Sequence, residues 1–327
     1  MGRPVAVIAF PAAERDLEPV AAVADVRRLP WPLDWETLLG SLADAEGVLI
    51  SNQWRLDERF FSAAPRLRVL SSYGVGYDAI DVEAATRHGV AVCNTPGVLS
   101  GAVADFTLGL ILALARRLLE NAAFGKREWA ERAPPPPLGW DLAGKTLGIV
   151  GMGRIGREVA RRARAFGMRV RYYDVRGPAG EPEDEFAELD EVLRAADVLS
   201  LHVDLNPTTH RLIGARELAL MKRTAVLVNT SRGAVVDQAA LVEALRSGRL
   251  AGAALDVLEQ EPPARGEPLL DLPNVIVTPH AASATVETRR AMFELARENL
   301  ISVLAGREPP ACVNPEALPR ALRRSGS

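Results

Sequence analysis

The sequence predicts an α/β protein with two Rossmann-like domains, each built on a parallel sheet. The chain has 327 residues, and at roughly 100–200 residues per domain this length suggests two domains. Short β-rich runs alternate with helical patterns along the chain, which is typical of parallel α/β sheets. The apolar runs are continuous rather than alternating, as expected for strands that are covered by helices on both faces.

The expected strands fall on both sides of one long apolar helix. In order along the chain they are Val5–Phe10, Val48–Ser51, Arg68–Ser72, Val90–Cys93, Thr146–Val150, Met168–Tyr173, Val198–Val203, Ala225–Asn229, Gly252–Val257 and Asn274–Thr278. The apolar stretch Ala102–Ala115 predicts a buried helix, and helical periodicity predicts further helices. These are Asp81–His88, Arg157–Phe166, Leu189–Ala196, Asp237–Ser247 and Thr285–Ala305. The proline run Ala133–Pro137 predicts a stiff loop.

Composition and charge are those of an ordinary globular protein. Hydrophobic residues make up 48% of the chain and charged residues 25%. The net charge of −3 gives no reason to expect nucleic acid or an anionic membrane as partner. Two cysteines, Cys93 and Cys312, do not make a disulfide framework, which fits a reducing compartment. We find no signal peptide pattern, and Ala102–Ala115 is shorter than the ~20 residues that cross a bilayer, so we expect a cytoplasmic protein.

A glycine pattern follows the predicted strand Thr146–Val150 and opens an amphipathic helix. Gly151 permits a tight turn, Gly153 lets the backbone approach a pyrophosphate, and Gly156 allows the helix to pack closely on the strand. Arg154 and Ile155 lead into this helix, so its N-terminus would face the phosphates. This context predicts a dinucleotide site rather than an ordinary glycine-rich turn.

The end of the next predicted strand indicates which dinucleotide is preferred. Asp174 lies 18 residues after Gly156, where a carboxylate can accept hydrogen bonds from the adenosine ribose. The same charge would repel the 2′-phosphate of NADPH, so we expect NADH to be preferred. Arg176 follows closely and could recover part of that loss, so NADP remains a possible cofactor.

The histidines differ in their predicted positions. His88 ends a helix and His210 lies in a polar loop, so both are expected to be surface residues. His202 lies within the strand Val198–Val203, where a structural or cofactor-side role is favoured. His280 follows a strand at the carboxyl edge of the sheet, where ligands of open α/β sheets bind. Histidine exchanges protons near neutral pH, so His280 is the candidate acid/base residue.

Several blocks together resemble the D-isomer-specific 2-hydroxyacid dehydrogenase family. They are Thr230–Asp237, Asp256–Pro262, Pro279-His280, Tyr73–Asp78 and Gly151–Gly156. The similarity runs in order from about Val48 to Asn314. The segments Val103–Gly109 and Ala113–Arg117 are most similar to the glyoxylate/hydroxypyruvate reductase branch. The resemblance implies an enzyme that reduces a small 2-oxo acid with NAD(P)H.

The resemblance also implies a role for individual residues. Arg232 would bind the substrate carboxylate, His280 would donate the proton and Glu261 would be its partner, with Glu259 as the alternative partner. The amides of the Val75–Gly76 loop would hold the carboxylate in a backbone nest. The residues expected to line the cofactor are Gly151, Gly153, Arg154, Ile155, Gly156, Asp174, Arg176, Thr230, Asp256, His280 and Ala282.

The architecture implied is a catalytic domain of residues 1–98 plus 286–327, with the cofactor domain, residues 99–285, inserted between. The long apolar helix would lie in a homodimer interface. The chain departs from the family pattern at Asp204, where proline is usual, and at Ala133–Pro137, which puts a substrate contact across the dimer in doubt. Two alternatives remain open: a dehydrogenase of 2-ketogluconate, D-lactate or phosphoglycerate, and a non-metabolic cofactor-sensing protein of the same fold.

Overall fold

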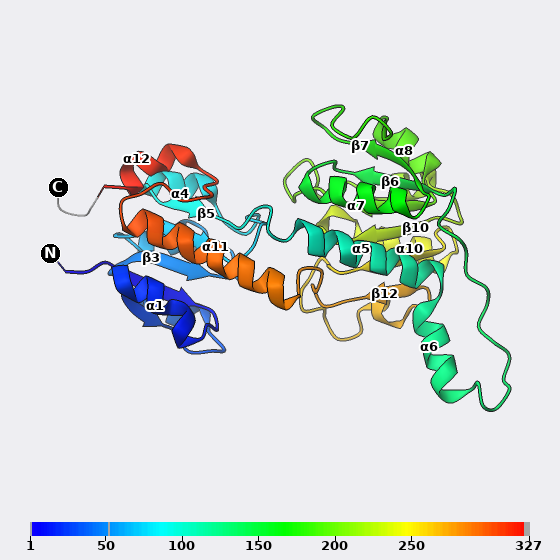
Figure 1. Cartoon of the computed structure of the whole chain (residues 1–327), viewed down its shortest axis with the longest axis horizontal. Coiled ribbons are helices and arrows are strands. Elements are labelled where there is room, and N and C mark those ends of the chain that lie inside the picture. The colour runs from blue at the N-terminus through cyan, green and yellow to red at the C-terminus, as the bar shows by residue number, and fades with distance from the viewer. Residues whose placement is uncertain (1, 52, 324–327) are drawn as a thin grey trace. The chain divides into compact units, whose positions relative to one another are not determined.

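The computed structural model describes residues 2–51 and 53–323 and consists of two compact units (Figure 1). One unit ends at Leu99 and resumes at Thr285, and the other spans Ser100–Ala284. Each unit holds one parallel sheet covered by helices, which confirms the predicted fold class. Within the described ranges, no helix combines the length and the apolar character that a membrane span requires.

The first unit has a five-stranded sheet in the order β2-β1-β3-β4-β5. Its strands are β1 (Val5–Ala9), β2 (Asp25–Arg28), β3 (Ala45–Ile50), β4 (Val69–Ser72) and β5 (Ala91–Cys93). Its helices are α1 (Glu14–Val23), α2 (Trp35–Gly40), α3 (Glu58–Ala63), α4 (Val82–His88), α11 (Val286–Leu304), the 3-10 helix η3 (Pro315–Ala317) and α12 (Leu318–Ala321). Alternate residues of each strand enter two separate cores, one beneath α2, α3 and α4 and one beneath α1 and α11.

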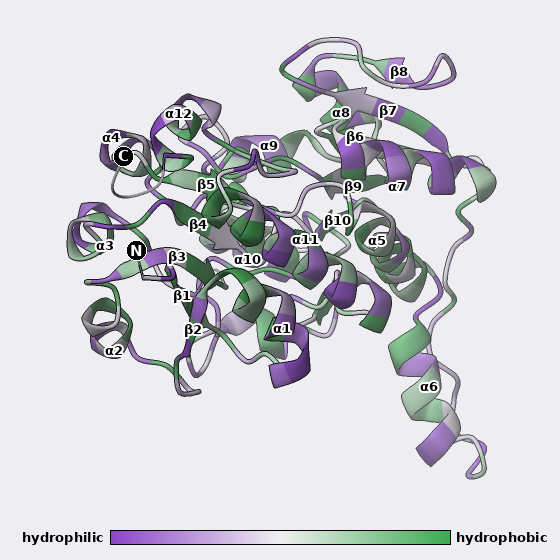
Figure 2. Ribbon diagram, turned by 60° about the vertical axis from the view of Figure 1, so that its left-hand side comes forward, coloured by the Kyte–Doolittle hydropathy of each residue, from purple (hydrophilic) through white to green (hydrophobic). Residues whose placement is uncertain are grey.

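Helix α11 approaches the five-stranded sheet closely because a glycine faces it. A Cβ on Gly47 would lie 2.6 Å from a side-chain carbon of Leu300. Strands β1, β3, β4 and β5 contribute apolar residues to both cores, and much of this sheet has hydrophobic colouring in Figure 2.

The second unit has a seven-stranded sheet in the order β12-β11-β10-β9-β6-β7-β8. Its strands are β6 (Thr146–Val150), β7 (Arg169–Tyr173), β8 (Glu185–Phe186), β9 (Val198–Leu201), β10 (Val226–Asn229), β11 (Gly252–Leu255) and β12 (Val275–Val277). Its helices are α5 (Ser100–Ala115), α6 (Leu118–Arg127), α7 (Arg154–Ala165), α8 (Leu189–Ala195), α9 (Ala215–Leu220), η1 (Gly233–Val235), α10 (Gln238–Arg246) and η2 (Pro268–Asp271). Helices α5 and α7 cover one face, and α8, α9 and α10 cover the other.

The structure corrects several predicted elements. The strands β2 and β8 were not predicted, because both are short edge strands with polar sequences and exposed side chains. His202 was expected inside a strand, but β9 ends at Leu201 and His202 is the next residue. Helix α7 begins at Arg154, three residues before the expected start, because Gly153 already caps it. The short helices α2, α3 and α9 and the proline-containing α1 were not predicted.

Helix α6 and the segment that follows it extend away from the sheet of their unit (Figures 1 and 2). None of the residues of α6 is buried. Large apolar side chains nevertheless gather here, with Leu119 58%, Trp129 73% and Leu138 96% exposed. The Ala133–Pro137 run has no helix or strand, as predicted.

Candidate active site

Most of the predicted site residues lie at one edge of the seven-stranded sheet. Neighbouring strands in this sheet are parallel, so their carboxyl ends share an edge. From β12 to β7, the residues beyond these ends are His280, Asp256 with Glu261, Arg232, His202, the Gly151–Gly156 loop and Asp174. Residues that are far apart in the sequence therefore share the edge at which ligands of open parallel sheets bind.

The loop Gly151–Gly156 has a conformation that requires glycine at both ends. Gly151 has φ +96°, and a Cβ there would lie 2.6 Å from the carbonyl oxygen of His202. A Cβ on Gly156 would lie 2.2 Å from the carbonyl oxygen of Gly151. Any larger residue at position 156 would push α7 away from the loop.

The N-terminus of α7 is open enough to receive a phosphate. Gly153 caps the helix, and none of the described side chains bonds this helix end. A Cβ on Gly153 would meet only the guanidinium of Arg176, at 3.9 Å. Helix N-termini have backbone N–H groups without intrahelical partners, and here these begin at Arg154 and Ile155. The residues present thus fit the pyrophosphate of a dinucleotide.

Asp174 and Arg176 form a bidentate ion pair beside this loop. One oxygen of Asp174 accepts from the amide and from Nε of Arg176, at 2.9 and 3.0 Å. The other accepts from the amide of Met152 at 2.9 Å and from Nη2 of Arg176 at 3.1 Å. The hydrogen bond to Arg176 outweighs burial and lowers the pKa of Asp174. The carboxylate, with about four acceptor positions in all, is therefore charged and fully engaged.

His280 and Glu261 form a second hydrogen-bonded pair. Nδ1 of His280 lies 2.7 Å from one oxygen of Glu261, and the amide of Leu258 donates to the other at 3.1 Å. Burial acts to raise the pKa of Glu261, but the hydrogen bond and the charge of His280 lower it below its ordinary value. Glu261 is therefore charged at neutral pH. Because Nδ1 of His280 faces Glu261, Nε2 of His280 is the ring nitrogen that can face other partners.

The alternative partner, Glu259, is engaged elsewhere. One of its oxygens accepts a hydrogen bond from Nε of Arg211 at 3.3 Å. Of the two glutamates considered from the sequence, Glu261 is the one that forms a hydrogen bond with His280.

The turn that carries Arg232 is held by Asn229, which ends β10. Oδ1 of Asn229 accepts from the amide and the hydroxyl of Ser231, at 3.0 and 2.8 Å. Its Nδ2 donates to the carbonyl of Arg232 at 2.9 Å. Asn229 was not among the predicted residues, although a buried amide at the end of an apolar strand was a usable signal.

This turn packs directly against the segment that carries Glu261. A Cβ on Gly233 would lie 1.9 Å from the carbonyl carbon of Leu258, so only glycine fits. Among smaller effects, the positive charge of Arg232 contributes to the low pKa of Glu261. Arg232, Glu261 and His280 therefore belong to one electrostatically connected group.

Asp256 is buried and braces the loop that carries His280. One of its oxygens accepts from the hydroxyl of Thr278 at 2.6 Å and from the amide of Ala281 at 2.7 Å. The other accepts from the amide of Ala282 at 2.9 Å. The contacts of Asp256 and Ala282 are thus with the loop itself, and their expected contact with the cofactor stays a prediction.

His202 is half-buried beside the glycine loop, and Thr230 is buried beside the arginine turn. Burial lowers the pKa of His202 to about 3, so this ring is neutral, and it bonds the hydroxyl of Ser200 at 2.8 Å. The hydroxyl of Thr230 lies 3.0 Å from that of Thr107 on α5. The low pKa and burial of His202 make it unsuitable as a proton donor at neutral pH.

Val75 and Gly76 belong to the five-stranded unit, in the loop after β4. Nδ2 of Asn94 donates to the carbonyl of Val75 at 2.8 Å, and the amide of Thr95 donates to the carbonyl of Gly74 at 2.9 Å. Asn94 was not predicted as a site residue, yet it fixes the backbone of this loop.

A cavity of about 830 Å³ lies at the same edge of this unit. Tyr73 lines it, stacked on Phe10 with ring centroids 5.1 Å apart, and the guanidinium of Arg289 lies 5.9 Å from the tyrosine ring centroid. Its charged lining consists of Arg15, Arg289, Arg290, Arg297, Asp16 and Glu294. Cations outnumber anions, so the cavity favours an anionic guest.

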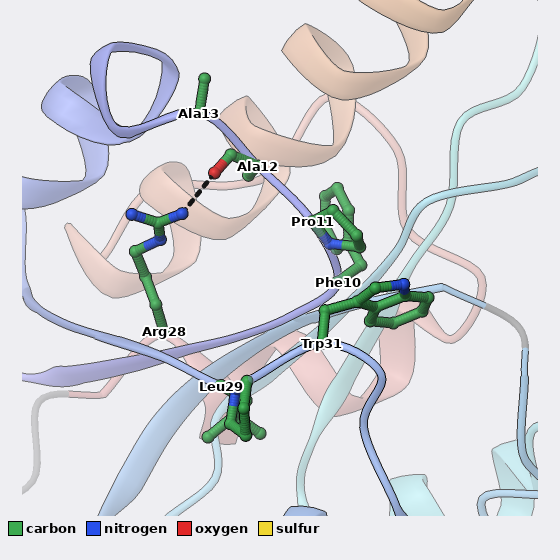
Figure 3. Close-up of a pocket in the computed structure, with 8 residues that line it drawn as sticks. Phe10, Pro11, Ala12, Ala13, Arg28, Leu29 and Trp31 are labelled. Atoms are coloured by element: carbon green, nitrogen blue, oxygen red, sulfur yellow. Dashed lines mark hydrogen bonds between the residues drawn. The ribbon is translucent and has the colours of Figure 1, made fainter.

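A smaller cavity of about 480 Å³ adjoins the same residues (Figure 3). Phe10 and Trp31 line it, and Arg28 closes one side by donating to the carbonyl of Ala12 at 2.7 Å. It contains none of the predicted site residues.

Comparison with known proteins agrees with this geometry. Residues 108–282 match the family model of the D-isomer specific 2-hydroxyacid dehydrogenase, NAD binding domain. The chain is 52% identical over 269 residues to a glyoxylate reductase of Korarchaeum cryptofilum, covering 80% of this chain and 81% of that protein. It is 49% identical over 296 residues to a glyoxylate reductase of Aeropyrum pernix, covering 88% of each.

Solved structures give the same result. A protein from Thermus thermophilus superposes with a TM-score of 0.87 at 46% identity, covering 94% of this chain and 99% of that one. An NADPH-dependent glyoxylate/hydroxypyruvate reductase from Sinorhizobium meliloti, in complex with NADP and malonate, has a TM-score of 0.87 at 33% identity over the whole of both chains. The chain therefore belongs to the D-isomer specific 2-hydroxyacid dehydrogenase family, in its glyoxylate reductase branch, and is an NAD(P)-dependent 2-hydroxyacid dehydrogenase.

Proposed function

We propose that this protein reduces glyoxylate or hydroxypyruvate, in preference to larger 2-oxo acids, to the corresponding 2-hydroxy acid. The observation that carries the proposal is the 2.7 Å pair of His280 and Glu261, in the same unit as Arg232 and the glycine loop. The similarity to curated glyoxylate reductases supports this choice of substrates.

In this proposal each side chain has one task. A nicotinamide cofactor, when bound at the glycine loop, supplies the hydride. Arg232 binds the substrate carboxylate through its planar guanidinium and so orients the carbonyl group. His280 donates the proton from Nε2 to the carbonyl oxygen, because Nδ1 is bonded to Glu261. The charged Glu261 stabilises the protonated imidazole and fixes the ring.

The loop of Val75 and Gly76 supplies backbone amides for the same carboxylate. Successive amides in such a loop bind anions without a side chain. Asn94 and Thr95 fix the backbone of this loop, which favours a preformed site. The excess of arginine in the adjoining cavity supports an acidic substrate.

A substrate panel tests the proposal. We expect the highest kcat/KM for glyoxylate or hydroxypyruvate among 2-oxo acids that also include 2-ketogluconate, pyruvate and phosphohydroxypyruvate. His280→Ala should abolish reduction, whereas His210→Ala, which removes an exposed side chain, should leave it unchanged. A higher efficiency with a larger acid would assign another dehydrogenase activity. Cofactor binding without turnover of any acid would instead favour a cofactor-sensing protein.

We further propose that NADH is preferred over NADPH by about tenfold or more in efficiency. The support is Asp174, a charged carboxylate that is 5% exposed and sits beside the phosphate-binding loop. A 2′-phosphate would meet this charge, and like charges in contact cost several kcal/mol. Arg176 opposes the effect, since its side chain is 69% exposed and could turn toward a phosphate.

Two substitutions separate these contributions. Asp174→Asn keeps an oxygen that can accept from the Met152 amide but removes the charge, so NADPH efficiency should rise. Arg176→Ala removes the only cation paired with Asp174 among the described residues, so NADPH efficiency should fall. NADH efficiency, measured with the same preparations, is the internal control. An unmodified protein that uses NADPH as well as NADH would refute the preference.

We also infer a homodimer formed through α5 and α6. The support is the exposure of three large apolar side chains on and after α6, Leu119, Trp129 and Leu138. Exposed apolar patches of this kind mark association sites in soluble proteins. Leu119→Glu should shift the mass measured by light scattering from dimer to monomer. Leu270→Glu, at another exposed leucine, is the matched control.

A further inference from the structure

The two cysteines of the chain are 219 positions apart in the sequence. Both pack against the same core of the five-stranded unit. Cys93 ends β5 and is fully buried. Cys312 lies in the segment after α11, is half-buried, and packs against the same core. Figure 1 shows this C-terminal segment returning to β5 and α4. The thiol of Cys312 donates to Oδ1 of Asn314 at 3.7 Å, and the side chain of Asn314 in turn bonds the strand residue next to Cys93.

Backbone hydrogen bonds hold the two segments in register. The amide of Val313 donates to the carbonyl of Val92 at 2.8 Å. The side chain of Asn314 accepts from the amide of Val92 at 2.7 Å and donates to the carbonyl of Val90 at 3.0 Å. The cysteines next to these residues are therefore held close to each other, on the same core.

The two thiols differ in reactivity. Interaction with the Cys93 thiol outweighs burial and lowers the pKa of Cys312, which favours its thiolate. Interaction with Cys312 and burial both raise the pKa of Cys93. Thiolates are the nucleophilic form, so the partly accessible Cys312 would react first and the buried Cys93 second.

We propose that Cys93 and Cys312 form an oxidation site that hydrogen peroxide converts into a reversible intramolecular disulfide. The Cys312 thiolate attacks the peroxide, so an S–O bond forms, the O–O bond breaks, and hydroxide leaves and is protonated to water. The Cys93 sulfur then attacks the resulting sulfenic acid, so the S–S bond forms and the S–O bond breaks. The proton of Cys93 leaves with the departing hydroxide as a second water. Two thiols are oxidised and one peroxide is reduced.

The cross-link would lie next to residues that support the Val75–Gly76 loop. Asn94, which follows Cys93, donates from its side chain to the carbonyl of Val75. Its own carbonyl accepts from Nδ2 of Asn299 at 2.9 Å, and Oδ1 of Asn299 accepts from the amide of Ala311 at 3.0 Å. The disulfide would therefore link the segment of Cys93 and Asn94 covalently to the segment of Ala311 and Cys312.

The test uses the full-length protein, reduced and then treated with a modest excess of hydrogen peroxide. We expect both thiols to be lost to a thiol reagent in denaturant, and a monomer lighter by two hydrogen atoms. Dithiothreitol should restore both thiols. The oxidised protein should also melt higher, because the cross-link closes a long loop of the unfolded chain. None of these measurements depends on catalysis, so they stand apart from the proposed function.

Single variants separate the two thiols. In Cys93→Ala, Cys312 should stop at a sulfenic acid that dimedone traps. In Cys312→Ser, Cys93 should keep its thiol under the same treatment, because it is buried. A wild-type monomer that gains oxygen at Cys312 while Cys93 stays free would overturn the proposal. So would a disulfide between two chains, or two thiols that survive the treatment.

Discussion

Replacing Glu261 by glutamine tests the proposed acid/base pair most directly, because it removes one charge and little else. Glutamine has the same shape, and its oxygen can still accept from the Leu258 amide, which now lies 3.1 Å from the carboxylate. Its amide group would face Nδ1 of His280 in place of the carboxylate oxygen at 2.7 Å. A neutral partner stabilises the protonated imidazole less, so we expect weaker proton donation from His280.

The size of the effect follows from the distance and the exposure of the pair. Two unit charges 2.7 Å apart attract by about 1.5 kcal/mol in water and by about 6 kcal/mol at an effective dielectric constant of 20. The side chains of His280 and Glu261 are 50% and 38% exposed, so solvent screening favours the lower part of this range. A loss of about 1.5–3 kcal/mol of this attraction corresponds to a kcat/KM for reduction that is about 10- to 150-fold lower.

The assay is kcat/KM for reduction, measured at one neutral pH. The protonated ring donates the proton in reduction, so Glu261→Gln should lower kcat/KM by this factor. The matched control is Glu259→Gln, which removes a charge paired with Arg211 and should leave kcat/KM unchanged. An unchanged kcat/KM in Glu261→Gln, or a similar loss in Glu259→Gln, would refute the assignment.

Three other substitutions test the rest of the site. Arg232→Lys keeps the charge but not the planar fork, and should lower kcat/KM for reduction by about 30- to 4,000-fold, equivalent to roughly 2–5 kcal/mol; unchanged kinetics would contradict the role. Gly156→Ala puts a Cβ 2.2 Å from the Gly151 carbonyl oxygen and should weaken NADH binding in a fluorescence titration, whereas Gly40→Ala, with open space around it, should not. Asn229→Ala leaves the buried arginine turn without its hydrogen bonds and should destabilise the protein by about 1–3 kcal/mol in urea while raising KM for the 2-oxo acid.

The sequence by itself determined the fold class, most strands and the glycine loop. These depend on short-range patterns: a buried strand such as β6 is an unbroken apolar run, and α7 repeats apolar residues at helical spacing. The role of a glycine can be predicted from the sequence where a turn or a close approach excludes any side chain, as at Gly156. The edge strands β2 and β8 were missed for the same reason, because half-exposed edges carry no continuous apolar run.

The choice between similar side chains was decided only by tertiary structure. Glu259 and Glu261 both suited the role of partner to His280, and their backbone positions send one to Arg211 and the other to the histidine. The ion pair of Asp174 and Arg176 is local, but the Met152 amide that bonds the same carboxylate comes from the distant glycine loop.

The positions of the two cysteines were also decided only by tertiary structure, because they are far apart in the sequence. Nothing in the local sequence around Cys93 or Cys312 indicates that the two residues pack on the same core. Periodicity reports which face of an element is buried, but not which residue of a distant segment packs on that face. That contact depends on the register of the C-terminal segment along β5, which hydrogen bonds from Val313 and Asn314 set only once the sheet has formed.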